Sequence, residues 1–154
     1  MLLRLPNSLA LAELTADDYL DVLTRLSMIV KLPAWTSSES KRDIKQAKYH
    51  FADTGIAAAR RQITPATFNP DADPSALGAM LESFVHGEVL KSLPYQENDF
   101  RLYHWRSTHQ KEIDIMAESA TRLVGIEVKA SSTIDDSDLK HLRSFAKDLS
   151  LIHI

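Results

Sequence analysis

The chain has 154 residues and a formal net charge of −3 at pH 7, with 44% hydrophobic and 25% charged residues. This composition is globular rather than disordered, and the length suits one ordinary domain or a small domain plus a compact second one. Because the chain has no cysteine, disulfides and thiolate sites are excluded. No apolar run approaches the roughly 20 residues that span a bilayer, so we expect a cytoplasmic protein with no membrane partner.

Residues 1–63 are expected to form a helix followed by two short strands. Thr15 can cap the helix, and apolar residues recur behind it at helical spacing. The runs 28–32 and 49–51 are β-prone, and the loop between them is basic. This order is typical of a winged-helix-like segment. Four of its basic side chains are candidates for phosphate contact: Lys41, Arg42, Lys45 and Lys48.

The charges are unevenly distributed along the chain. Between Lys31 and Arg61, seven basic residues stand against three acidic ones, whereas between Asp71 and Asp138 thirteen acidic residues stand against six basic ones. The basic stretch could contact phosphate directly, while the acidic stretch would need a cation before phosphate could approach. The alternative is two solvated surfaces of opposite sign.

Residues 64–74 read as a linker, because they contain three prolines together with Asn and Asp. The remaining residues, 75–154, are predicted to form a helix, three strands, a second helix and a final strand at 151–154. The first helix would carry Phe84 on its apolar face, with His86 as a surface residue. The predicted fold class is therefore α/β, in an α+β arrangement.

The strands and the last helix of this part follow from shorter patterns. Residues 100–106 are rich in β-formers, and Ile113 and Ile115 alternate with polar residues in the next strand. A third strand would direct Val124, Ile126 and Val128 into the core. Asp135 or Asp136 is expected to cap the last helix, whose inner face would include Ala146.

Charged residues on two of these strands are expected to share one sheet surface. Residues two apart in a strand face the same side, so Glu127 and Lys129 would lie together, and a hairpin at 118–122 would bring Asp114 beside them. Two carboxylates can hold Mg²⁺, a cation that prefers oxygen ligands. A nearby lysine can orient water and stabilise developing negative charge. A cross-strand ion pair on a solvated sheet is the alternative interpretation.

The spacing of Asp114 from the Glu127-x-Lys129 pair resembles the PD-(D/E)XK, or restriction-endonuclease-like, superfamily. In that superfamily the helix before the first strand often adds a glutamate, which corresponds here to Glu82. The resemblance implies Glu82, Asp114, Glu127 and Lys129 as catalytic residues. It also implies Glu82, Asp114 and Glu127 as ligands of Mg²⁺ or Mn²⁺.

A narrower resemblance covers roughly residues 15–150. The stretches 77–85, 103–106, 112–115 and 125–131 resemble the C-terminal region, known as domain of unknown function 4143, of a family of prokaryotic AAA-type ATPases. Residues 48–55 resemble the winged-helix stretch of the same family. The chain contains no G-x-x-x-x-G-K-[ST] phosphate loop, so ATP binding by that route is not expected.

These patterns predict a metal-dependent nuclease-like domain that hydrolyses nucleic-acid phosphodiesters, with DNA as the expected substrate. One alternative is a catalytically inactive module that binds nucleic acid or protein for an AAA-type ATPase. Another is a partner-interaction domain that binds no nucleic acid.

Overall fold

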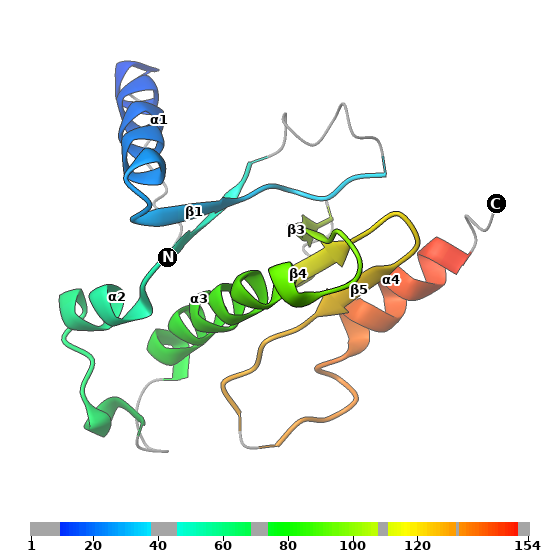
Figure 1. Cartoon of the computed structure of the whole chain (residues 1–154). Helices are drawn as coiled ribbons and strands as arrows, with labels where there is room; N and C mark the ends of the chain where they lie inside the picture. The colour runs from blue at the N-terminus through cyan, green and yellow to red at the C-terminus, as the bar shows by residue number, and fades with distance from the viewer. Residues whose placement is uncertain (1–9, 38–45, 69–73, 108–110, 132, 151–154) are drawn as a thin grey trace.

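The computed structural model describes residues 10–37, 46–68, 74–107, 111–131 and 133–150, and the chain is α+β. Figure 1 shows the arrangement of its helices and strands. In chain order the elements are α1 (Ala10–Arg25), β1 (Ile29–Leu32), β2 (Lys48–Phe51), α2 (Thr54–Arg60), η2 (Pro65–Phe68), α3 (Pro74–Ser92), η3 (Leu93–Tyr95), β3 (Arg101–Arg106), β4 (Glu112–Glu118), β5 (Leu123–Ile126) and α4 (Lys140–Ser150). The predicted final strand at 151–154 lies outside the described residues. None of the helices in the described ranges has the length and apolarity needed to cross a membrane.

The N-terminal half contains the expected helix and a two-stranded antiparallel sheet. β1 pairs with β2 from Ile29 opposite Phe51 to Leu32 opposite Lys48. The helix α1 begins at Ala10, so the expected cap at Thr15 is wrong. Residues 10–14 are Ala, Leu and Glu, which are strong helix formers and extend the helix toward the N-terminus. Figure 1 shows α1 meeting the start of β1 at its C-terminal end and lying away from the β3-β4-β5 sheet.

The segment after β1 connects the two halves of the chain. Ala34 forms a parallel bridge with His104 of β3, supported by hydrogen bonds from Trp35 N to His104 O (2.6 Å) and from His104 N to Pro33 O (2.9 Å). Trp35 is thereby carried into the main core, where its ring meets Phe145 edge-on at 5.4 Å. The hydrophobic core therefore contains residues from both sides of the predicted linker.

The main sheet is antiparallel, in the order β3-β4-β5. Its register shifts between Tyr103, opposite Met116, and Trp105, opposite Ile113, so two residues of β4 face one residue of β3. Such a β-bulge re-aims the side chains of the strand that carries the extra residue. The two β4 residues at the bulge are Asp114 and Ile115.

One face of this sheet is covered by α4. The core cluster there consists of Trp35, Tyr103, Ile113, Met116 and Phe145, with Trp105, Leu123 and Leu142 packed against it. A Cβ at position 125 would lie 2.6 Å from Leu142 Cδ2, so Gly125 allows α4 to approach β5 closely.

Several predicted orientations are corrected by this packing. Leu123, rather than Val124, faces α4, and Val124 is 44% exposed. The helix α4 begins at Lys140, after an Asx-type turn in which Asp135 accepts hydrogen bonds from the backbone of Ser137 and Asp138. Phe145 of this helix is buried, whereas Ala146 is exposed.

On α3, the expected roles of Phe84 and His86 are exchanged. Phe84 is 50% exposed, and His86 is 2% exposed. The reason is that α3 lies against β2 and α2, where the ring of His50 stacks on His86 with centroids 4.4 Å apart. The two rings fill the contact between helix and strand that an apolar side chain was expected to fill.

Candidate active site

The end of β5 lies beside Asp114. Ile115 pairs with Ile126, and the backbone N–H of Val128 donates to Asp114 Oδ2 at 2.8 Å. The strand β5 ends at Ile126, so Glu127 lies just beyond it rather than within it as predicted. The carboxylate of Asp114 therefore holds the segment that carries Glu127.

Glu127 and Lys129 form an ion pair at this position. Lys129 Nζ lies 2.7 Å from Glu127 Oε1, and the Glu127 side chain is only 8% exposed. The hydrogen bond that Lys129 donates to Glu127, opposed by partial burial and assisted by the charge of Asp114, raises the pKa of Lys129. The second oxygen, Glu127 Oε2, is buried and has no hydrogen-bond partner within the described part of the chain. One oxygen of this carboxylate is thus buried without the hydrogen bond that buried polar atoms usually make.

A second lysine lies among the neighbouring carboxylates. Lys48, the first residue of β2, places Nζ 2.7 Å from Glu82 Oε1, 2.6 Å from Glu112 Oε1 and 3.7 Å from Asp114 Oδ1. Burial alone would lower the pKa of Lys48, but the charges and hydrogen bonds of Glu82 and Glu112 outweigh it, so the pKa is raised. The ammonium group is therefore held in its charged form.

The carboxylates respond to the same environment in opposite ways. Burial raises the pKa of Glu82, although Lys48 partly offsets this effect. Burial also disfavours the charged form of Glu112, but the hydrogen bond from Lys48 prevails and lowers its pKa. Arg106 approaches Glu112 at 4.0 Å from the exposed edge. Four carboxylates thus face two lysines and this edge arginine, and negative charge predominates.

Two buried histidines, His50 and His86, lie near Glu82. His50 is 4% exposed, and its Nδ1 lies 3.1 Å from Ser83 Oγ. The Ser83 hydroxyl also contacts the carbonyl oxygen of Ala79 at 3.1 Å. Among the described residues, His50 Nε2 has no hydrogen-bond partner, and it lies 4.0 Å from Glu82 Oε1. Burial, with smaller contributions from His86 and Lys48, lowers the pKa of His50 to about 3.

The described residues contain no group of three or more His, Cys, Asp or Glu side chains arranged to hold a metal ion. Mg²⁺ commonly uses one or two protein carboxylates and keeps several waters. Asp114 and Glu127 are the candidates for that smaller requirement, because Glu127 Oε2 has no partner among the described residues and Asp114 holds the segment that carries Glu127. Glu82 would become a ligand only without its contact to Lys48.

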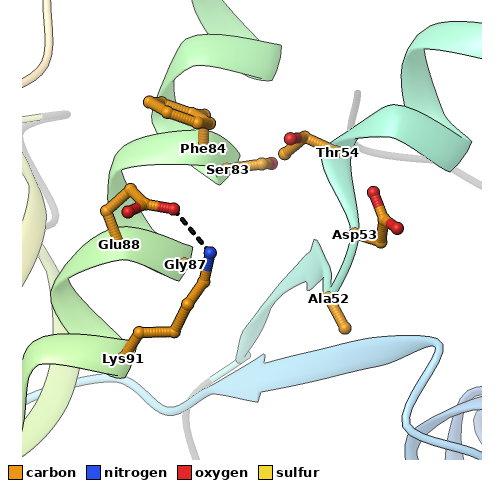
Figure 2. Close-up of a pocket in the computed structure, with 8 residues that line it drawn as sticks. All are labelled: Ala52, Asp53, Thr54, Ser83, Phe84, Gly87, Glu88 and Lys91. Carbon is orange, nitrogen blue, oxygen red and sulfur yellow. Dashed lines mark hydrogen bonds and ion pairs between the residues drawn. The ribbon is translucent and has the colours of Figure 1, made fainter.

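A pocket of about 300 Å³ lies elsewhere, between α3 and the start of α2 (Figure 2). Ser83 and Phe84 line it on the helix side, Asp53 and Thr54 on the opposite side, and the Lys91–Glu88 ion pair lies at its edge. None of the four predicted catalytic residues lines it. The pocket is therefore separate from the carboxylate cluster, although Ser83, which lines the pocket, contacts His50, which lies near Glu82.

The structure brings Glu82, Asp114, Glu127 and Lys129 into one region through the contacts described above. The expectation that Lys48 lies in a basic loop is wrong: it begins β2, and the carboxylates draw its ammonium inward. The other three residues of that prediction lie outside the described residues: Lys41, Arg42 and Lys45.

Sequence reasoning missed Glu112 and His50. Glu112 precedes Asp114 by two residues in the same strand, so strand periodicity could have found it. His50 had no comparable signal, because its side-chain partners Ser83 and His86 lie more than 30 residues away along the chain.

Comparisons with known proteins divide the chain at the predicted linker. Residues 4–67 match the model of a domain of unknown function (DUF8612). Two relatives are the uncharacterized proteins Rv2008c of Mycobacterium tuberculosis and Mb2031c of Mycobacterium bovis, each 31% identical over 150 residues. The alignment covers 97% of this chain but only 32% of each relative, so the chain spans about a third of their length. No solved structure matches. Residues 77–153, half of the chain, match the model of a domain of unknown function (DUF4143), and the chain belongs to that family.

Proposed function

We propose that the chain is a metal-dependent nuclease-like domain that hydrolyses phosphodiester bonds in nucleic acid, with DNA as the first substrate to test. The observation that carries the proposal is Glu127. One of its oxygens is paired with Lys129, the other is buried without a hydrogen-bond partner among the described residues, and Asp114 holds the backbone of the next residue, Val128. A buried, half-satisfied carboxylate is costly, and a divalent cation would compensate it.

The proposed division of labour follows from the contacts. Asp114 and Glu127 hold Mg²⁺ or Mn²⁺, which when bound supplies positive charge against the scissile phosphate and acidifies water. Lys129 is kept charged by Glu127, so its proposed role is to stabilise negative charge that develops on the phosphate. Glu82 is a candidate for a second metal or for orienting water. Lys48 is not included among the nucleic-acid contacts, because its ammonium faces the carboxylates.

A binding module remains the second candidate, and a specific observation favours it. Lys48 already neutralises part of the charge of Glu82, Glu112 and Asp114, as expected for a site that works without metal. In that case the chain would bind nucleic acid or a protein such as an AAA-type ATPase. Such binding would be indifferent to Mg²⁺ and Mn²⁺.

Cleavage of single-stranded, double-stranded and branched DNA in the presence of Mg²⁺ or Mn²⁺ tests the proposal. Asp114→Asn removes the charge but nearly preserves the shape, and Lys129→Met removes the ammonium group. Each is expected to lower the cleavage rate by about a hundredfold or more, because loss of a metal ligand or charge stabiliser typically costs that much.

Matched controls come from the exposed surface. Asp136, 86% exposed at its side chain and paired with Arg143, provides Asp136→Asn, and the exposed Lys140 provides Lys140→Met. Both should cleave like the wild type. Absence of metal-dependent cleavage on all three kinds of DNA, together with DNA binding that Asp114→Asn leaves unaltered, would establish the binding module instead.

A further inference from the structure

The helix α1 carries an apolar face that the described part of the chain leaves largely uncovered. It packs mainly against β1, and none of its described side chains, those of residues 15–25, is buried (Figure 1). Leu20 and Leu23 are half-buried, whereas Tyr19, Val22 and Leu26 are 67%, 52% and 64% exposed. Helices in proteins gain most of their stability by packing an apolar face, because a helix of this length is marginal in water by itself. The outer face of α1 is therefore available to a second helix.

The exposed apolar residues follow the spacing of a coiled-coil seam. Val22 follows Tyr19 by three residues, and Leu26 follows Val22 by four, so the three side chains lie along one line of the helix. The backbone N–H of Leu26 donates to Val22 O at 3.0 Å, which continues the helical hydrogen bonding past the end of α1. A seam of this kind is normally buried against a partner helix.

Two opposite charges lie on one flank of this seam. Asp18 and Arg25 are seven residues apart, so they occupy equivalent positions one heptad apart, and both are exposed. Asp17 and Asp21 lie on the opposite side of the helix, away from the seam. In an antiparallel pair of two such helices, the flanks that carry Asp18 and Arg25 face each other. Asp18 of each copy then lies opposite Arg25 of the other, because an isologous contact is made twice.

We propose that α1 is a self-association helix through which two copies of this chain pair in antiparallel orientation. The register that joins Asp18 to Arg25 of the second copy also packs Tyr19 against Val22 of the second copy, so charges and apolar side chains favour the same alignment. A parallel pair lacks this agreement, because Asp18 would face the uncharged Leu23 of the second copy. The proposal goes beyond the proposed function and does not depend on it.

The size of the contact predicts a weak dimer. The 16 residues of α1 extend over about 24 Å at a rise of roughly 1.5 Å per residue. Two helices of this length bury less surface than the roughly 1,200–2,000 Å² of a standard stable interface. We therefore expect a dissociation constant on the order of 1–100 μM for the dimer.

Sedimentation equilibrium of the full chain, at concentrations from about 1 to 500 μM, tests the proposal. Asp18→Arg and Arg25→Asp each turn both contacts between the copies into like-charge pairs, so each variant should self-associate about tenfold more weakly or less. An equimolar mixture of the two variants should associate about as tightly as the wild type, since every contact in the mixed dimer again joins opposite charges. Arg60→Asp, at an exposed position of α2, is the matched control and should dimerise like the wild type.

Recovery in the mixture also shows that each variant is folded, because a chain without α1 could not associate. A mixture that stays monomeric would overturn the antiparallel register, as would single variants that dimerise like the wild type. Val22→Ser changes an exposed apolar residue of the seam and should weaken self-association by about tenfold or more. Unchanged association of Val22→Ser, or a wild-type chain that is monomeric over the whole concentration range, would refute the role of α1.

Discussion

Stability should fall on mild acidification, and His50 should account for a measurable share of the loss. Burial lowers its pKa from 6.5 to about 3 in the folded chain, whereas the unfolded chain regains an ordinary histidine. Between these two values the unfolded state binds a proton that the folded state does not. The stabilising contribution of neutral His50 is therefore complete above pH 6.5 and is lost progressively as the pH falls toward 3. From pH 7 to pH 5 the loss attributable to His50 is about 2 kcal/mol.

Urea unfolding at both pH values measures this loss. His50→Gln will shift the whole stability curve, so the informative quantity is the difference in unfolding free energy between pH 7 and pH 5. That difference should be about 2 kcal/mol smaller in His50→Gln than in the wild type. Glu82 acts with the opposite sign, because burial raises its pKa, and comparison of the two proteins largely removes its contribution. Ile113→Val, which is destabilised without losing a titratable group, should retain the wild-type difference. If His50→Gln and the wild type lose the same free energy, the buried neutral histidine is refuted.

Two further predictions concern packing. Ile113 is 1% exposed in the cluster beneath α4, so Ile113→Ala should lower the free energy of unfolding by about 2–5 kcal/mol in urea titrations, and a loss below 1 kcal/mol would place it outside the core. Gly125→Val should lower the free energy of unfolding by about 1–3 kcal/mol, because its Cβ would meet Leu142 Cδ2 at 2.6 Å. If this contact is the cause, a Gly125→Val/Leu142→Ala double variant should recover part of the loss. A double variant that recovers none of it would contradict this explanation.

The existence and order of the elements could be predicted wherever periodicity was strong. The helix now bounded at Pro74–Ser92 and the strand around Ile113 follow from apolar spacing, and the strand around Trp105 follows from its richness in β-forming residues. The starts of α1 and α4 were missed because several residues can cap a helix, and local propensity or an Asx turn decides between them.

Which face each residue presents was harder to predict. The alternation in β5 gives no indication that Gly125, rather than Val124, lies beneath α4, since the close approach depends on Leu142 from a helix that follows later. The bulge at Asp114 likewise depends on the partner strand. His86 could not be distinguished from a surface histidine, because the ring that covers it belongs to His50, 36 residues earlier in the sequence.

In the candidate site, too, contacts between residues close in the sequence could be predicted, whereas contacts between distant residues could not. Glu127 and Lys129 are two residues apart, and their pairing follows from local geometry. Lys48 has a sequence context typical of a basic loop, and only the pairing of β2 with β1 and the contact of β2 with α3 turn it toward Glu82. The residues matched by DUF4143 alone would therefore present Glu82, Glu112 and Asp114 without the lysine that lies among them. Since half-buried like charges without a partner are destabilising, the N-terminal half of the chain is part of the site's charge balance, whichever function that site performs.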